Sequence, residues 1–327
     1  MYPLPKRLRD LQAKVRKFVD AELIPLEVHA EMNNGEIPPE ARKRQLAMTK
    51  KMGLWNMGIA KKHGGNGMGV LDEAIVQEQF ARATNALGWV MPGASPWMME
   101  VCTPHQLKTW VRPCMEGKRA AAYAITEENA GSDVDAIEAT VKRVQGGYVL
   151  NGLKWHVTSA NYADHLIFQG KLANGPHKGK HALVFVDKDS PGVEVVRTPA
   201  YTHNYRSHHP IMAFKNVKVP AANLIGEEGG GMHWTYAWFR EERLMIAARC
   251  CGAASRLIDE ATAFAQKRVQ FGQPIANYQA IQFMLADSVT ELWAARLMTY
   301  RCAEEIDNGI DVKASHAQCS MVKLYAS

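Results

Sequence analysis

Two adjacent carboxylates, Glu241 and Glu242, stand before Arg243 and are the residues of this sequence best suited to acid–base chemistry. A carboxylate acts as a general base when its surroundings raise its pKa towards neutrality. Neighbouring residues of a helix point about 100° apart, so only one of the two can face a given ligand. Helical spacing alone leaves the choice open, and the commoner meaning of such a Glu-Glu-Arg run is a solvated helix face.

A second polar segment, residues 122–136, begins as a short apolar strand and continues into a turn with Thr126, Asn129, Ser132 and Asp133. Its hydroxyls and backbone N–H groups suit a polar ligand, although an ordinary loop has the same composition. No nucleotide-binding loop of the GxxxxGK[ST] or GxGxxG kind is present, and HExxH and GxSxG are absent. The glycine-rich stretch at residues 64–69 is therefore interpreted as a plain turn.

Three histidines, His203, His208 and His209, gather in one short segment before an expected strand at Ile211. Histidine clusters bind metals in many proteins, but no cysteine or acidic partner lies nearby in this sequence. We interpret the segment as a polar loop and predict no metal site.

Three longer motifs identify a family resemblance. The segment AYAITEENAGSDV, residues 122–134, resembles the flavin-binding signature of the acyl-CoA dehydrogenase family. GLKWHVTSANYADHL, residues 152–166, resembles the family segment that places an aromatic residue and a threonine beside the flavin. QKRVQFGQPIANYQAIQFMLAD, residues 266–287, resembles a third family motif. The motifs follow the family's order and spacing, and the resemblance covers nearly the whole chain.

The resemblance implies FAD as cofactor, bound without a Rossmann fold between a β domain and the C-terminal helices. The residues that match flavin contacts within one subunit are Tyr123, Ile125, Thr126, Ser132, His156 and Thr158. Arg268, Phe271 and Gln279 match residues that hold the FAD of a neighbouring subunit, which implies a homotetramer or homodimer. His156 departs from the family, because the family usually has Trp, Phe or Tyr at that position.

The implied reaction is the α,β-dehydrogenation of an acyl-CoA thioester, as in fatty acid metabolism. A carboxylate removes the α proton, the β hydrogen leaves as hydride to flavin N5, and an electron-transfer flavoprotein accepts the electrons. Ser132, Arg240 and Arg243 match positions near the substrate. Some members place the base on the helix just before this arginine, which selects Glu242.

Many members instead place the base in a late segment, and this chain ends at Ser327 before it. We therefore expect the chain to be truncated at its C-terminus, with Glu242 as base or with the base in the missing segment. Two alternatives stay open: an oxygen-reactive flavin oxidase or monooxygenase on the same scaffold, and a truncated, flavin-free scaffold protein.

The elements that must position these residues divide the chain into three. Apolar residues at helical spacing predict an N-terminal helical domain over residues 1–117. Short alternating strands predict a central antiparallel β barrel or sandwich over residues 118–228, with hairpin turns at Gly146-Gly147 and Asn151-Gly152. Helical spacing returns over residues 229–327 and predicts a C-terminal helical bundle, incomplete at its end. The predicted fold class is α+β.

Composition is ordinary for a globular protein of 327 residues, with 47% hydrophobic residues and a net charge of +6. No uninterrupted apolar run predicts a membrane span, and no basic tract interleaved with aromatics predicts nucleic-acid binding. The six cysteines lack CxxC spacing and are expected to be reduced thiols. These features favour a cytoplasmic location, or the mitochondrial matrix if the source is eukaryotic.

Overall fold

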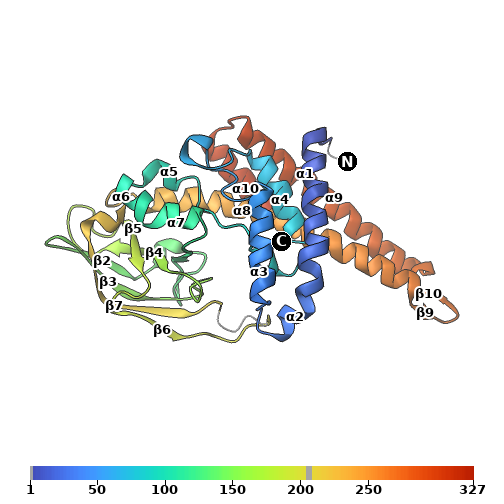
Figure 1. Cartoon of the computed structure of the whole chain (residues 1–327), viewed down its shortest axis with the longest axis horizontal. Coiled ribbons are helices and arrows are strands. Elements are labelled where there is room, and N and C mark those ends of the chain that lie inside the picture. Colours follow the sequence, from blue (N-terminus) through green and yellow to red (C-terminus); the bar gives the residue numbers. More distant parts are fainter. Residues whose placement is uncertain (1–2, 204–207) are drawn as a thin grey trace.

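The helix α8 (Gly231–Lys267) is 37 residues long and runs from the edge of a central sheet to the end of a protruding arm (Figure 1). The structure is a computed structural model that describes residues 3–203 and 208–327. Helices come first, a sheet follows and long helices end the chain, as predicted.

The N-terminal helices pack beside α8 and build the first layer. Their bounds are α1 Lys6–Phe18, α2 Glu27–Met32, α3 Pro39–Lys51, α4 Val70–Phe80, α5 Met98–Val101, α6 Pro104–Gln106 and α7 Arg112–Met115. In α1 the apolar spacing places Leu8, Val15 and Phe18 in the core. The helix does not stop sharply before Pro25, because a π-helical turn (Val19–Leu23) and a 3₁₀ turn (Ile24–Leu26) continue it.

The central sheet has eight strands in the order β6-β7-β3-β2-β4-β5-β8, with β1 also paired to β4. The strands are β1 Ala121–Ala124, β2 Thr140–Val144, β3 Gly147–Lys154, β4 His165–Leu172, β5 His181–Asp187, β6 Val193–Arg197, β7 Ile211–Pro220 and β8 Leu224–Ile225. Val141, Leu150, Phe168 and Phe214 are fully or almost fully buried in its core.

The predicted all-antiparallel pairing needs a correction, because the sheet is mixed and the described strands do not close into a barrel. Both β1 and β2 run parallel to β4, with Ala121 opposite His165 and Thr140 opposite Lys171. β1 and β2 therefore run in the same direction. The residues that connect them, 125–139, form a long loop, which we call the detour. That detour contains most of the first family motif.

One of the two predicted hairpin turns forms, but at Gln145-Gly146, one residue before the predicted Gly146-Gly147. β2 turns into β3 at Gly146, with Val144 opposite Gly147. Asn151-Gly152 is instead a register shift inside β3, between Leu150 and Gly152. A Cβ atom on Gly152 would lie 2.5 Å from the Ala139 Cβ, so close packing, and not a turn, requires glycine here.

Two further helices, α9 (Gln279–Asp307) and α10 (Val312–Ala326), pack on α8. Between α8 and α9 a small hairpin, β9 (Val269–Gln270) and β10 (Gln273–Pro274), forms the end of the arm (Figure 1). The glycine-rich stretch at residues 64–69 is a turn, as predicted, and it leads into α4. Asp307 caps α4 by accepting from the Val70 and Leu71 amides at 2.6 and 3.0 Å. None of the helices described is both long and apolar enough to span a membrane.

Candidate active site

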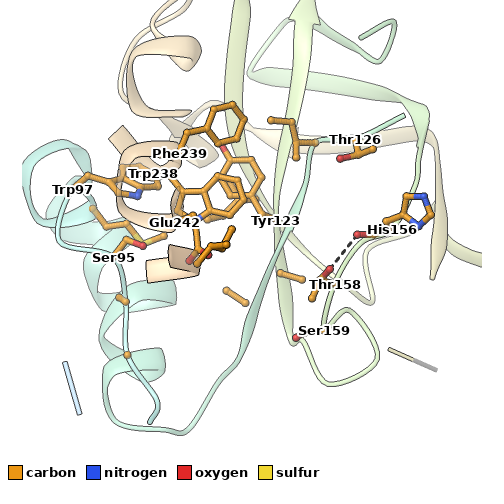
Figure 2. Close-up of a pocket in the computed structure, with 18 of the residues that line it drawn as sticks. Ser95, Trp97, Tyr123, Thr126, His156, Thr158, Ser159, Trp238, Phe239 and Glu242 are labelled. Atoms are coloured by element: carbon orange, nitrogen blue, oxygen red, sulfur yellow. Dashed lines mark hydrogen bonds between the residues drawn. The ribbon is translucent and has the colours of Figure 1, made fainter. Parts of the chain in front are cut away.

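A cavity of about 990 Å³ lies where β1, the detour after it, the turn at residues 156–159 and α8 meet (Figure 2). We call it the sheet-side cavity. Its walls include these residues singled out from the sequence: Tyr123, Ile125, Thr126, Ser132, His156, Thr158, Glu242 and Arg243. Its size is that of a pocket for a cofactor or a drug-sized ligand.

A stacked aromatic pair forms part of the wall of the sheet-side cavity. Tyr123 on β1 stacks on Trp238 on α8, with ring centroids 4.4 Å apart and planes 6° apart. The Tyr123 hydroxyl donates to Gln169 Oε1 at 3.2 Å and lies 3.1 Å from Thr235 Oγ1. Burial raises the pKa of Tyr123, so this side chain is a neutral, fixed wall.

A buried lysine fixes the detour after β1. Lys154 on β3 is fully buried, and its Nζ donates to the Ile125 carbonyl and to Glu127 Oε1, each at 2.8 Å. Burial lowers the pKa of Lys154 to about 8 although Glu127 opposes the shift. Glu127 also accepts from the amides of Glu138 and Ala139 at 2.6 and 3.0 Å, which closes the loop that holds Ser132.

The turn at residues 156–159 forms the opposite wall. Thr158 Oγ1 donates to the His156 carbonyl at 3.3 Å (Figure 2). His156 has a left-handed backbone, with φ of 50°, and its Nδ1 lies 2.7 Å from the Tyr201 hydroxyl.

The histidines of the predicted polar loop pack against this turn. Thr158 Oγ1 lies 2.9 Å from His209 Nδ1, and Ser159 Oγ lies 3.2 Å from His208 Nε2. Burial and the neighbouring histidines lower the pKa of His208 to about 4, so its ring is neutral near pH 7. Within residues 3–203 and 208–327 no three His, Cys, Asp or Glu side chains are arranged to hold a metal.

Glu242 lines the sheet-side cavity and lies near Ser95 and Trp238 in Figure 2. Its Oε2 accepts from Arg249 Nη2 at 2.9 Å, two helical turns later on α8. Glu242 and Arg249 also line a second cavity of about 680 Å³, between α3, α4, the loop at residues 88–96 and α8. We call this the helix-side cavity, and Glu242 stands at the boundary between the two.

Glu241 does not line the sheet-side cavity, but it is not the solvated residue that its sequence suggests. It lies in the wall of the helix-side cavity with Glu73 of α4, and Ser95 hydrogen-bonds its carboxyl group. Burial raises the pKa of Glu241 to about 8, and the carboxyl groups of Glu73 and Glu242 add to the shift. Burial likewise raises the pKa of Glu73 to about 7. The solvated helix face that is the commoner meaning of a Glu-Glu-Arg run does not describe the surroundings of Glu241.

A third cavity, of about 840 Å³, lies beside the N-terminal half of α8 and is called the outer cavity. Arg240 and Arg243 line it together with Lys313 and His316 from α10. Arg243 also reaches the sheet-side cavity and places its guanidinium carbon 5.4 Å from the Phe239 ring centroid. The structure thus brings the two predicted substrate arginines to one cavity next to the main one, whose wall also includes Glu100, Glu241 and Asp311.

Three predicted cofactor residues lie elsewhere in this chain. Arg268, Phe271 and Gln279 sit at the β9–β10 end of the arm and are exposed. Phe271 is 96% exposed at the tip of its hairpin. In a single subunit these side chains are far from the sheet-side cavity, on the other side of Figure 1.

Sequence reasoning missed Glu73, Lys154, Trp238 and Arg249. A weak signal exists for Arg249, because residues seven apart on a helix share a face. Glu73 also stands out as a charge among the buried residues of α4. No sequence signal indicates that Lys154 is buried, because that depends on the pairing of β3 within the sheet.

Comparison with known proteins places this chain in one family. Three successive family descriptions match the chain: "Acyl-CoA dehydrogenase, N-terminal domain" at residues 5–118, "middle domain" at 122–217 and "C-terminal domain" at 229–327. The chain belongs to the acyl-CoA dehydrogenase family, as the sequence motifs predict.

Among its relatives is an acyl-CoA dehydrogenase of Bacillus subtilis, 30% identical over 97% of this chain and 83% of that protein. The caffeyl-CoA reductase-Etf complex subunit CarC of Acetobacterium woodii is 30% identical, over 95% of this chain and 82% of the length of CarC. A probable acyl-CoA dehydrogenase structure from Mycobacterium abscessus covers 100% of this chain and 86% of its own, with 31% identity and a TM-score of 0.87.

An FAD complex of PigA shares the fold with a TM-score of 0.87, at 24% identity and with 100% and 86% of the two chains covered. The FAD cofactor expected from the sequence agrees with this family and these neighbours.

Proposed function

We propose that this protein is an FAD-dependent acyl-CoA dehydrogenase in which Glu242 removes the α proton of an acyl-CoA thioester. The observation that supports this most is the position of Glu242. Its carboxylate borders the cavity whose other walls are the flavin motif residues Tyr123, Thr126 and Thr158. Its sequence neighbour Glu241 does not border that cavity.

The residues present fit FAD. The sheet-side cavity combines aromatic faces with the hydroxyl groups of Thr126, Ser132 and Thr158. Two of its lining residues, Trp97 and His165, have a buried ring nitrogen without a hydrogen-bond partner in the part of the chain that the structure describes. Buried polar atoms rarely stay unpaired in a complete site, so a polar ligand is expected here. When bound, FAD supplies the acceptor for the β hydrogen as hydride.

The protein's own residues position the substrate and move the proton. Glu242 takes the α proton, and Arg249 holds its carboxylate at the cavity wall through their 2.9 Å contact. Hydrogen-bond donors directed at the thioester oxygen stabilise the enolate-like charge that develops there. Lys154 and Glu127 keep the loop with Thr126 and Ser132 in place.

The outer cavity suits the anionic end of coenzyme A. Arg240, Arg243 and Lys313 offer cationic groups that bind phosphate, and arginine does so in a bidentate manner. Arg243 lines both cavities, so the two cavities adjoin. One extended acyl-CoA molecule can therefore place its thioester in the sheet-side cavity and its phosphates in the outer cavity.

The arm is proposed as the contact between subunits of a homotetramer or homodimer. Its two helices expose apolar side chains on the same protruding element: Leu257, Phe264, Phe283, Met284, Val289 and Trp293. Apolar patches of this kind mark protein interfaces. A second copy would then place Arg268 and Phe271 at the FAD of its neighbour. An electron-transfer flavoprotein is the proposed electron acceptor, since one relative is a subunit of an Etf complex.

The test is anaerobic stopped-flow reduction of the flavin by acyl-CoA. Wild-type protein should be yellow and should bleach. Glu242→Gln keeps the shape of the side chain but removes the base, so bleaching should slow by about a hundredfold or more, the usual scale for a general base. Glu40→Gln, an exposed change on α3, is the matched control.

Acyl-CoA binding to Glu242→Gln is measured separately, so that loss of binding is not mistaken for loss of the base. Bleaching of Glu242→Gln at nearly the wild-type rate would place the base elsewhere. Rapid reoxidation by air with peroxide formation would instead favour a flavin oxidase or monooxygenase. Full-length protein without flavin would favour the scaffold alternative.

A further inference from the structure

The helix-side cavity is where the acyl group of the substrate has to extend. It adjoins the sheet-side cavity through shared walls that include Ser95, Glu242 and Arg249. With Glu242 at the α carbon, the thioester faces the flavin motif and the rest of the acyl chain continues past Glu242. A cavity of about 680 Å³ is ample for such a chain.

Apolar side chains such as Met91 and Met245 form much of the wall of this cavity, but carboxyl groups interrupt it. Of the four carboxyl groups in the wall, Glu242 pairs with Arg249 and Asp164 accepts from the Ala120 amide, which leaves Glu73 from α4 and Glu241 from α8. Glu73 is hydrogen-bonded by the Gly58 backbone, and Glu241 by Ser95. Asn56 also lines it and provides an independent sign of a missing partner, because its buried Oδ1 accepts no hydrogen bond from the described residues. All three side chains belong to the wall of one cavity.

Cations of the protein do not satisfy these acceptors. Each cation in the cavity wall already has a partner of its own: Arg42 the Trp89 carbonyl, Lys118 Glu116, Arg119 Asp187, and Arg249 Glu242. No ion pair in the described part of the chain includes Glu73 or Glu241. Apart from Ser95 and the Gly58 backbone, the described residues give these acceptors no donor, so a ligand can supply one.

We infer that the preferred substrate is an acyl-CoA whose acyl group bears a hydrogen-bond donor, a hydroxyl or an ammonium group, which Glu73, Glu241 and Asn56 receive. This inference rests on the proposed dehydrogenase function and names its substrate class. A plain alkyl chain would cover the acceptors without pairing them. A site built to hydrogen-bond a substrate group discriminates strongly against the analogue that lacks it.

The experiment compares matched substrates on the FAD-loaded enzyme. Butanoyl-CoA and hexanoyl-CoA are each compared with their ω-hydroxy and ω-amino analogues in anaerobic flavin reduction. We expect kcat/KM for at least one substituted substrate to exceed that of its alkyl counterpart by about tenfold or more, the effect of one good hydrogen bond in a buried site.

Variants connect the preference to the cavity. Glu73→Leu and Glu241→Leu should each shift the ratio of substituted to alkyl kcat/KM at least tenfold towards the alkyl substrate. The exposed control Glu40→Leu should leave the ratio unchanged. Glu241→Gln keeps the shape and the hydrogen-bonding capacity but cannot ionise. It should retain the preference for a hydroxyl group and lose that for an ammonium group, which separates the two donors.

Failure of this inference is distinct from failure of the proposed function. If every alkyl substrate bleaches the flavin as well as its substituted analogue, the dehydrogenase stands and the polar acyl pocket is refuted. If the wild-type preference is present but Glu73→Leu, Glu241→Leu and Glu241→Gln all preserve it, the preference arises elsewhere and the inference is also refuted. If no acyl-CoA of any kind bleaches the bound flavin, the dehydrogenase itself fails.

Discussion

Glu241 and Glu242 are adjacent on α8 but face different surroundings, as their side chains point about 100° apart. Glu242 pairs with Arg249 beside the sheet-side cavity. Glu241 faces the carboxyl group of Glu73 on α4, Ser95 in the loop before α5, and Arg240 on its own helix. The like charges and burial favour the protonated form of Glu241 in the folded protein, with consequences for stability as well as for binding.

The pKa of Glu241 is raised to about 8 from 4.5, so the folded state holds a proton that the unfolded state releases above pH 5. Stability therefore falls as pH rises from about 5 to about 8. Glu241→Gln removes this loss, because glutamine does not ionise. From pH 5.5 to 8.5 the unfolding free energy of wild type should fall by at least about 1 kcal/mol more than that of the variant, since one pKa unit corresponds to about 1.4 kcal/mol. Urea unfolding at both pH values measures this difference. Equal pH dependence in the two proteins would show that Glu241 ionises normally.

At the scale of the element, the β9–β10 hairpin is a two-residue turn at the end of a long arm. Phe271 has φ of 52° and Gly272 has φ of 81°, the left-handed pair that such a turn needs. A phenylalanine in this conformation, at full exposure, has no packing role within the subunit. Its position suits contact with a second subunit.

Arg268→Ala should therefore weaken flavin retention although the residue is far from its own subunit's cavity. We expect at least a tenfold weaker FAD affinity, because a bidentate arginine contact to phosphate is among the stronger hydrogen-bonding interactions. Flavin occupancy after desalting and FAD titration of the apoprotein measure the effect. Arg301→Ala, which removes an exposed arginine of α9, is the matched control. Unchanged occupancy and affinity in Arg268→Ala would contradict the shared-site arrangement.

At the scale of the whole molecule, a buried polar network joins the N-terminal helices to the C-terminal ones. Glu78 of α4 is almost fully buried and accepts from Arg296 Nε at 3.1 Å and from the Tyr300 hydroxyl at 2.8 Å, both on α9. Gly252 of α8 lies against the same turn of α4, since a Cβ there would meet the Glu78 carbonyl oxygen at 1.8 Å. Helices α4, α8 and α9 thus meet at one point.

Glu78→Ala should destabilise the folded protein by roughly 3 kcal/mol, because it leaves the Arg296 charge and a buried hydroxyl group without their acceptor. Asp10→Asn breaks the exposed Lys6–Asp10 pair and should cost less than about 0.5 kcal/mol. Thermal and urea unfolding of both variants measure the difference. A loss in Glu78→Ala as small as that in Asp10→Asn would mean that the network adds little to stability.

The sequence by itself determined the order of helices, strands and helices and the family, because helical spacing, strand alternation and three long motifs are local properties of the chain. It also located Tyr123 and Thr126 on one segment, Thr158 on a second and Glu242 on a third. Only the tertiary structure decided that these four border one cavity, because contacts between β1, the 156–159 turn and α8 join residues far apart in sequence.

The parallel pairing of β1 and β2 with β4 was likewise decided by the fold, since strand alternation does not specify direction. Enclosure beside Glu73 shifts the pKa of Glu241, and no pattern in α8 indicates which carboxyl group of another helix will lie against it. Local patterns specify elements, whereas the surroundings of a charged side chain depend on how those elements pack.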